Sequence, residues 1–419
     1  MKLAIVGGGS TYTPELIDGF ARLRATLPID EVWLVDPSEE RVSLVAGISQ
    51  RMFARAGHPG RVIATTDLIA GVSDADAVLI QLRVGGQDAR RGDETWPHEV
   101  HCIGQETTGP GGFAKALRTV PVVLRVAAAV REHAKPGAWI IDFTNPVGIV
   151  TRALLQEGHR AVGLCNVAIG FQRRFAGMFG VDPSRVELGH VGLNHLTWER
   201  SIRVDGVDRL PELLGSQLGE LAEEVELRPE LVRMLGVVPS YYLRYYYAHD
   251  EVLEEQLHEP PRADAVQAVE RELLALYADP RVDTKPEALE RRGGAYYSEA
   301  AIELLSGLVG DTGETRVVNL RNDGALPFLP DDHVIEVPAL VGASGVEALP
   351  VEPLADDIRG LVSAVAGYER LALDAAVHGS RDAVLRAMQA HPLVLQYDRA
   401  ERLTDLLLAH NREHLDWAK

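Results

Sequence analysis

The segment Leu3-Ala-Ile-Val-Gly-Gly-Gly-Ser-Thr-Tyr-Thr-Pro14 predicts the fold near the amino terminus. Its apolar run Leu3–Val6 is typical of a buried strand, and the glycines that follow permit a tight turn. Pro14 indicates the start of a helix, because proline is tolerated in the first helical turn. Backbone N–H groups at such a turn can face a pyrophosphate, so the segment predicts a nucleotide site.

The glycine spacing differs from the usual dinucleotide motif, because Tyr12 stands where a third glycine is expected. Asp36 strengthens the nucleotide interpretation, since it follows a second predicted strand, Glu31–Val35. Its carboxylate can accept a hydrogen bond from a ribose 2′-hydroxyl and would repel a 2′-phosphate, which favours NAD over NADP. The alternative interpretation is an ordinary tight turn in an α/β protein.

Apolar strands and helical patterns alternate through the first 165 residues. This alternation predicts a parallel, doubly wound sheet, in which ligands bind at the carboxyl ends of the strands. After Gly180 the pattern changes to antiparallel strands and a helix-rich, acidic stretch. We therefore expect an α/β NAD-binding domain at residues 1–180 and a mixed α+β, helix-rich domain at residues 181–419. The expected strands are Leu3–Val6, Glu31–Val35, Ala77–Gln81, Ala138–Ile141, Ala161–Leu164, Arg185–Leu193, Leu196–Val204, Thr315–Leu320 and His333–Val337, and the expected helices include Pro14–Thr26, Glu39–Ala56, Lys115–His133, Asp356–Ala376 and Ala400–Leu415.

The composition of the 419 residues, with 46% hydrophobic and 25% charged residues, is that of an ordinary globular protein. A net charge of -19 argues against nucleic acid or an anionic membrane surface as a partner. The apolar run Leu3–Val6 is shorter than a secretory signal requires, and no apolar stretch approaches the ~20 residues that span a bilayer, so we expect neither a signal nor a membrane span. Its two cysteines are no disulfide framework, so we expect a cytoplasmic protein with free thiols.

Cys165 and His195 are candidate metal ligands beside the predicted sheet edge. A thiolate and an imidazole can share a divalent ion while leaving coordination positions open for substrate oxygens or water. The alternative is a buried small hydrophobe and a satisfied core histidine. Cys102 fits the interpretation as a buried small hydrophobe.

Several polar segments lie where ligands of such a sheet bind. Asn145 can donate and accept at the end of a strand, and the loop Gln105–Gly112 could bind an anion or simply cap a helix. Five arginines are candidates for binding a phosphate. Two of them in one pocket would form a phosphate clamp, whereas isolated surface arginines do not indicate a binding site. These arginines are Arg83, Arg90, Arg91, Arg291 and Arg292.

The run Tyr241–Tyr247 holds five of the 11 tyrosines. Tyrosines at helical spacing are typical of a core or an interface. A tyrosine near a metal ion can also act as a base, because the cation lowers the pKa of the phenol.

Together these segments resemble glycoside hydrolase family 4, from residue 1 to Ala390-His-Pro-Leu-Val394. The resemblance rests on the order and number of motifs, and the family is NAD-dependent. The motifs are Ile5–Leu16, Arg83-Val-Gly-Gly86, Ile103–Gly109, Thr144-Asn-Pro146, Gly163-Leu-Cys-Asn166, Gly192-Leu-Asn-His195, Tyr242–Tyr247 and Arg292–Ser298.

The resemblance implies a Rossmann-type domain in an arrangement like that of lactate and malate dehydrogenases. It also implies hydrolysis by oxidation of the sugar at C3, deprotonation at C2, elimination at C1, addition of water and re-reduction. NAD is then regenerated in each cycle, and a divalent metal, typically Mn²⁺, stabilises the enediolate.

Carried over residue by residue, the resemblance makes Cys165 and His195 the metal ligands. Tyr242 matches the base, although the neighbouring Tyr241 leaves an ambiguity of one residue. The implied NAD-binding residues are Gly7, Gly8, Gly9, Ser10, Thr11, Asp36 and Arg83, and the implied substrate-binding residues are Arg90, Glu106, Asn145, Asn166 and Arg292.

The residue after the metal cysteine indicates the subgroup. This chain reads Cys165-Asn-Val-Ala168, which resembles the Cys-Asn-Val-Pro of members that act on 6-phospho-β-glucosides. Asn166 cannot serve as a general acid, whereas α-specific members resemble Cys-His or Cys-Asp there. Ala168 in place of proline is a departure from the pattern. We therefore expect a phosphorylated β-glucoside, such as cellobiose 6-phosphate, as substrate.

Other functions remain open at this stage. The chain could act on α-linked or unphosphorylated sugars within the same family, or be an NAD-dependent 2-hydroxy-acid dehydrogenase, which would leave Cys165 without a role. A non-catalytic nucleotide sensor is a third class. Apolar helical stripes and the clustered tyrosines also predict self-association as a homodimer or homotetramer.

Overall fold

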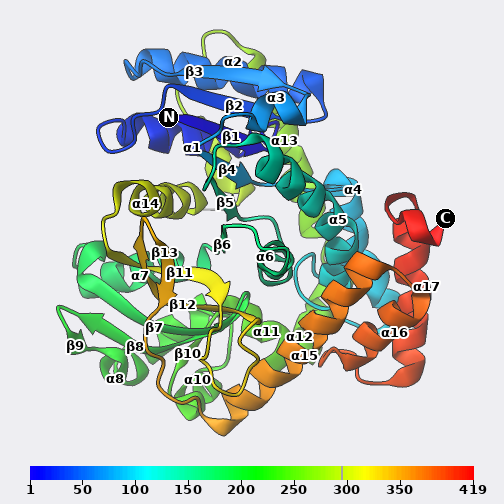
Figure 1. Ribbon diagram of the computed structural model, residues 1–419. Helices are drawn as coiled ribbons and strands as arrows, with labels where there is room; N and C mark the ends of the chain where they lie inside the picture. Colours follow the sequence, from blue (N-terminus) through cyan, green and yellow to red (C-terminus); the bar gives the residue numbers. More distant parts are fainter. Residues whose placement is uncertain (294–295) are drawn as a thin grey trace.

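The computed structural model describes residues 1–293 and 296–419; residues 294–295 of the motif Arg292–Ser298 lie outside the described residues. Within these ranges the strands form a single mixed sheet, and one half of it is parallel while the other is antiparallel (Figure 1). Its main path runs β10-β8-β7-β12-β11-β6-β5-β4-β1-β2-β3.

The parallel half has the strand order β3-β2-β1-β4-β5-β6, which confirms the predicted doubly wound sheet. Val6 pairs with Val35 on one side and Ile80 on the other, so these strands end at the same edge. The bounds are β1 Lys2–Val6, β2 Glu31–Val35, β3 Arg61–Thr65, β4 Ala77–Ile80, β5 Trp139–Asp142 and β6 Ala161–Gly163. The edge strand β3 was not predicted, because it has no buried residue that would produce a core-facing pattern.

Helices on both faces connect these parallel strands. The prediction for α5 was wrong at its start: the helix begins at Gly109 rather than at Lys115, because Pro110 and the glycines beside it form its first turn. The bounds are α1 Thr13–Arg22, α2 Glu39–Arg55, α3 Leu68–Val72, α4 Gly86–Thr95, α5 Gly109–His133, α6 Val147–Gln156 and α7 Val167–Phe179, with the 3₁₀ helices η1 Trp96–Val100 and η2 Pro183–Arg185.

The antiparallel half continues the same sheet, since Asn319 of β11 pairs with Gly163 of β6. The hairpin of β7 and β8 carries Asn194 and His195 at its turn. The bounds are β7 Val186–Leu193, β8 Leu196–Val204, β9 Val207–Asp208, β10 Val238–Pro239, β11 Glu314–Arg321, β12 Val334–Gly342 and β13 Gly345–Ala348.

Two helices from the later part of the chain return to the parallel half: α13 packs on α2 and α4, and α14 packs on α1. Near the carboxyl terminus, α15 packs on α5 and α16, and α16 packs on α17 (Figure 1). The division into residues 1–180 and 181–419 stays a prediction. The remaining bounds are α8 Leu210–Gly215, α9 Leu218–Glu224, α10 Pro229–Leu235, η3 Tyr241–Leu243, α11 Arg244–Tyr247, α12 His249–His258, α13 Arg262–Ala278, η4 Glu287–Arg292, α14 Tyr297–Gly310, α15 Asp356–His378, α16 Arg381–Ala390, α17 Tyr397–Asn411, η5 Arg412–His414 and η6 Asp416–Ala418.

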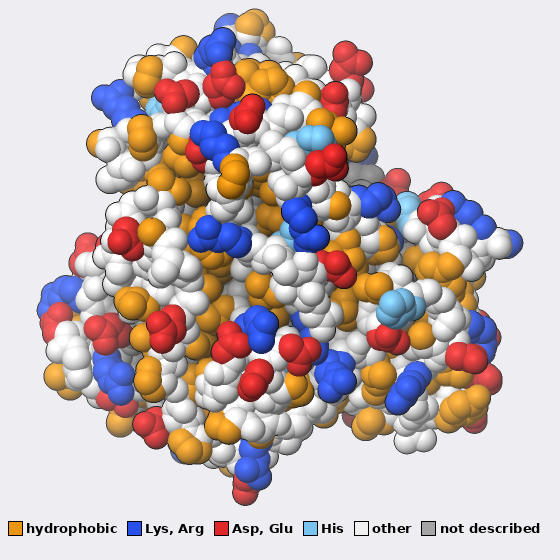
Figure 2. All heavy atoms as spheres, in the orientation of Figure 1, with side chains coloured by type: hydrophobic (Ala, Val, Ile, Leu, Met, Phe, Trp, Pro, Cys, Tyr) orange, Lys and Arg blue, Asp and Glu red, His pale blue; other side chains and the backbone are white. Residues whose placement is uncertain are grey.

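The surface carries mixed charge, and Figure 2 shows acidic and basic side chains interspersed over the face that it draws. In the described ranges, no helix combines the length and the apolar character that crossing a membrane requires.

Candidate active site

One cavity of about 850 Å³ lies along the carboxyl ends of the parallel strands and extends to the tyrosine run. It brings together most of the residues that the sequence singled out. The predicted residues in its lining are Gly7, Gly9, Ser10, Asp36, Arg83, Arg90, Glu106, Asn145, Asn166, Tyr242 and Arg292. Gly8, Thr11, Cys165 and His195 are buried next to lining residues and are not themselves part of the lining.

At one end of the cavity, the turn after β1 is packed so closely that only glycine fits at two of its positions. Gly7 has a φ of +87°, and a Cβ there would lie 2.5 Å from the carbonyl oxygen of Gln81. A Cβ on Gly9 would lie 2.7 Å from the carboxyl carbon of Asp36. Asp36 accepts hydrogen bonds from the backbone N–H groups of Gly9 and Ser38, at 3.1 and 3.0 Å. This side-chain-free cradle with a carboxylate beside it fits a dinucleotide.

Arg292 lies at this same end, against the first turn of α1. Its Nε donates to Thr11 Oγ1 at 2.7 Å, and its Nη2 lies 3.4 Å from Glu270 Oε1. Glu270, on α13, also accepts from Gln87 at 3.1 Å and faces Arg41 at 3.7 Å. Sequence reasoning missed Glu270, because nothing distinguishes it from the other carboxylates of an acidic helical stretch.

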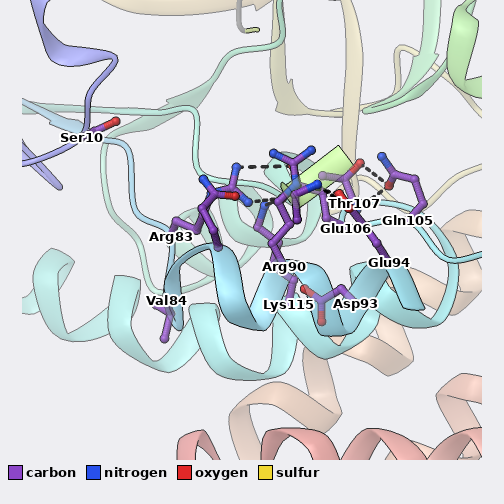
Figure 3. Close-up of polar contacts among 12 residues, drawn as sticks. Ser10, Arg83, Val84, Arg90, Asp93, Glu94, Gln105, Glu106, Thr107 and Lys115 are labelled. Atoms are coloured by element: carbon purple, nitrogen blue, oxygen red, sulfur yellow. Dashed lines mark hydrogen bonds and ion pairs between the residues drawn. The ribbon is translucent and has the colours of Figure 1, made fainter. Parts of the chain in front are cut away.

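The middle of the cavity holds a buried cluster of charges around Glu106 (Figure 3). Glu106 forms ion pairs with Arg83, with Arg90 at 3.3 Å and with Lys115 at 2.6 Å. Arg90 also pairs with Glu94 at 2.7 Å. Three cations therefore surround two carboxylates, and the lining keeps an excess of positive charge that suits an anionic ligand.

Burial changes the titration of this cluster. Although burial alone would raise the pKa of Glu106, the positive charges of Arg83, Lys115 and Arg90 hold it well below its usual range. Burial and the charge of Arg83 lower the pKa of Lys115 to about 7, against the opposing effect of Glu106. Lys115 was missed as a site residue, since the sequence placed it at the start of an ordinary helix.

At the other end, His195 projects from the turn between β7 and β8 with a φ of +61°. Its side chain is buried, its Nδ1 lies 2.9 Å from Thr107 Oγ1, and its Nε2 finds no hydrogen-bond partner within residues 1–293 and 296–419. Burial lowers its pKa to about 4, so the imidazole is neutral at physiological pH. A neutral ring with a buried, unpartnered nitrogen is the form that binds a metal ion.

Cys165 follows β6 and is also buried as a free thiol. Asn194, the residue before His195, hydrogen-bonds Cys165 and donates to Glu336 at 3.0 Å. Burial and the nearby Glu336 raise the pKa of the thiol well above its usual range, so a metal ion would have to displace its proton. Glu336 was missed, because it stands within an apolar strand pattern.

His195 and Cys165 both lie near Tyr242. The ring of Tyr242 stacks on that of His195 with centroids 3.6 Å apart and 6° between the planes. Burial, together with the charges of Cys165 and Glu106, raises the pKa of the Tyr242 phenol well above its usual range. The described residues contain no group of three or more His, Cys, Asp or Glu side chains able to hold a metal ion. Cys165 and His195 would supply two ligands and leave other coordination positions open. This donor set fits a divalent cation that also binds substrate oxygens.

Tyr241 has a different environment from Tyr242. Its side chain is 37% exposed, and its hydroxyl accepts a hydrogen bond from Arg244 at 3.2 Å. Tyr242 lines the cavity and Tyr241 does not, which favours Tyr242 over Tyr241 as the base. Tyr245 is buried in a small apolar cluster with Ile103, as expected for a core tyrosine.

Comparison with known proteins matches the chain along most of its length. A model described as family 4 glycosyl hydrolase matches residues 2–181, and one described as family 4 glycosyl hydrolase C-terminal domain matches residues 190–394. A curated relative named probable 6-phospho-β-glucosidase, from Bacillus subtilis, is 40% identical over 99% of this chain and 97% of its own length.

Solved structures show the same relationship. The 6-phospho-β-glucosidase of Thermotoga maritima with manganese, NAD⁺ and glucose 6-phosphate is 34% identical, covers 99% of both chains and has a TM-score of 0.91. Malate dehydrogenase from Salinibacter ruber, at 19% identity, covers 91% of this chain and 99% of its own with a TM-score of 0.56. The latter shows a shared fold, which confirms the predicted dehydrogenase-like arrangement.

Proposed function

We propose that this chain, which belongs to glycosyl hydrolase family 4, hydrolyses 6-phospho-β-glucosides with NAD and a divalent metal ion, most simply Mn²⁺. The observation that carries the proposal is the single cavity that joins the glycine turn to Tyr242 and Asn166, beside Cys165 and His195. The relatives named for the same activity, and the one solved with NAD⁺ and manganese, support it.

The chain's own residues would divide the work along the cavity. The glycine turn and Asp36 bind the dinucleotide, with Arg83 next to it, while Cys165 and His195 hold the metal ion. When bound, these two groups supply reversible hydride acceptance and Lewis acidity, respectively. The phenolate of Tyr242 would then take the proton from C2 of the sugar and become the hydroxyl. A nearby cation would favour this ionised form, because it lowers the raised pKa of the phenol.

We assign substrate recognition to the positively charged residues in the middle of the cavity. Arg90 lines this middle part, and Arg292 lines the cavity nearer to the glycine turn. Asn145 presents a buried Oδ1 for which the described residues supply no hydrogen-bond partner. Glu106 orders Arg90 and Arg83 through its ion pairs. Asn166 lines the cavity directly after Cys165, and its amide cannot donate a proton as an acid would, which supports the β-linked substrate.

The test is release of nitrophenol from p-nitrophenyl 6-phospho-β-glucoside under reducing conditions, with and without NAD⁺ and Mn²⁺. We expect release that needs both, without net NADH. The α-linked and unphosphorylated analogues, run alongside, should be poor substrates. Net accumulation of NADH from a 2-hydroxy acid, with no nitrophenol release, would instead support the dehydrogenase alternative.

We place this activity in the cytoplasm, where phosphorylated sugars and the free thiols of Cys102 and Cys165 persist. We also propose a homodimer or homotetramer. Large side chains near the carboxyl terminus support it, since Leu395, Tyr397 and Trp417 are 60%, 57% and 37% exposed. Light scattering coupled to gel filtration measures the mass in solution, and a monomer at micromolar concentration would contradict this assembly.

A further inference from the structure

We propose that Thr107 is a positioning residue that holds His195 in the tautomer whose Nε2 is free to bind the divalent ion. This inference deepens the proposed function and rests on its assignment of His195 as a metal ligand. It follows from a chain of hydrogen bonds that begins at Gln105, in the loop before α5 (Figure 3).

The first link fixes the orientation of the Gln105 amide. Its Oε1 accepts hydrogen bonds from the backbone N–H groups of both Thr107 and Thr108, the latter at 2.8 Å. Backbone N–H groups only donate, so the atom that faces them must be the amide oxygen rather than the NH₂ group. The Gln105 side chain therefore presents an acceptor, and only an acceptor, to its neighbours on this side.

The second link fixes the direction of the Thr107 hydroxyl. Its Oγ1 lies 2.8 Å from Gln105 Oε1 and 2.9 Å from His195 Nδ1. A hydroxyl has one hydrogen, and Gln105 Oε1 can only accept, so that hydrogen is committed to Gln105. The oxygen of Thr107 is then an acceptor toward His195, and Nδ1 must carry the proton of the neutral imidazole.

The third link is the consequence for Nε2. A neutral imidazole carries a single ring proton, so an Nδ1–H leaves a lone pair on Nε2. Nε2 is the buried atom of this ring for which the described part of the chain offers no hydrogen-bond partner, as expected for a nitrogen that binds a cation. Without the Thr107 oxygen, the proton could move to Nε2 and block that position, and the ring would lose one of the contacts that orient it.

The experiment measures Mn²⁺ binding itself, on reduced protein, from the electron paramagnetic resonance signal of free Mn²⁺ during a titration with Mn²⁺ alone. Thr107→Val keeps the shape of the side chain and removes the hydroxyl, and we expect it to raise the Kd for Mn²⁺ by about 10–100-fold. Thr107→Ser keeps the hydroxyl and should restore the wild-type Kd to within about threefold. A Kd for Thr107→Val within about twofold of wild type would overturn the proposal.

Thr108→Val is the matched control, because it removes a buried hydroxyl one residue away for which no hydrogen bond is found in the described part of the chain. Its Kd for Mn²⁺ should equal that of wild type, and an equal loss in Thr107→Val and Thr108→Val would overturn the proposal. NAD⁺ affinity, which depends on the other end of the cavity, serves as the check that each variant is folded.

A second measurement needs no variant of Thr107. In ¹⁵N-histidine-labelled, metal-free protein, with the His195 signals assigned from a His195→Gln spectrum, the proposal predicts a protonated Nδ1 and a bare Nε2. A protonated Nε2 would overturn it. If wild-type protein binds NAD⁺ but no Mn²⁺, the metal assignment in the proposed function fails, whereas failure of the Thr107 proposal leaves wild-type Mn²⁺ binding intact.

Discussion

The two ends of the cavity work by opposite means. The glycine-turn end, at Gly7–Gly9 and Asp36, offers a turn without side chains, open space and one carboxylate. The other end, at Cys165, His195 and Tyr242, offers buried titratable side chains whose pKa values are all displaced. Binding at the first end therefore depends on shape, and chemistry at the second depends on protonation. Variants at one end should leave the other end unaffected.

Removal of a metal ligand should have the largest effect. Cys165→Ala leaves His195 as the single protein ligand, and we expect kcat/KM for the nitrophenyl 6-phospho-β-glucoside to fall by about 10⁴-fold, the equivalent of several kcal/mol of Lewis-acid stabilisation. The Kd for NAD⁺, measured by titration, should stay within about twofold of wild type. A folded Cys165→Ala protein that keeps its full rate and Mn²⁺ dependence would refute the metal assignment.

Loss of the base should come next. Tyr242→Phe keeps the ring that stacks on His195 and removes the hydroxyl, so kcat should fall by about 10³-fold, within the usual range of general-base catalysis. Tyr241→Phe removes a neighbouring hydroxyl that faces Arg244, outside the cavity lining, and should leave kcat unchanged. Equal losses of kcat in the two variants would contradict the distinction drawn between these tyrosines.

A smaller effect is expected at the glycine-turn end. Asp36→Asn keeps the shape and an acceptor oxygen but removes the charge, and should weaken NAD⁺ binding by about tenfold, as for a lost charge-assisted hydrogen bond. Discrimination against NADP⁺ should fall as well, because the charge that repels a 2′-phosphate is gone. Mn²⁺ binding should not change, and a matching loss of Mn²⁺ affinity would show that the two ends are coupled.

Substitution of His190 should have the smallest effect on catalysis and should change stability instead. His190 is buried between Glu199 and Glu336. Burial alone would lower its pKa, but the two carboxylates raise it to about 10 from 6.5. The stabilisation by the protonated ring is therefore complete below pH 6.5 and is lost as the pH rises through about 10.

The thermal unfolding midpoint of the metal-free protein should accordingly fall from pH 7 to pH 10. The fall should be smaller in His190→Gln, whose side chain does not titrate. An identical pH dependence in the two proteins would show that other groups cause it.

The same contrast between the two ends explains what the sequence could predict. The glycine turn is one strand, one turn and one helix in succession, so its residues and the parallel, doubly wound sheet follow from local patterns. The strands Glu31–Val35 and Leu196–Val204 were predicted with their observed bounds, because their apolar residues stand out from polar flanks.

The other end is assembled from segments far apart in the chain. Tyr242 comes from the region before α11, Cys165 from the end of β6 and Glu336 from β12. Spacing gives no hint that they meet. The resemblance to a family implied the roles of Cys165 and Tyr242, whereas Glu336 was not predicted. Glu270 and Lys115 matter through contacts that only the fold creates, since each belongs to an unremarkable pattern in the sequence. Thr107 lies in the predicted loop Gln105–Gly112, but its contact with His195 is created only by the fold.

The central claim is that both ends act on one sugar within a single cavity, so that oxidation at C3 permits Tyr242 to exchange the proton at C2. The most direct test is hydrolysis of p-nitrophenyl 6-phospho-β-glucoside in D₂O with NAD⁺ and Mn²⁺, followed by NMR of the glucose 6-phosphate formed. We predict deuterium at C2 of the product and no net NADH. Product that retains its C2 hydrogen, formed at the same rate without NAD⁺, would contradict the account.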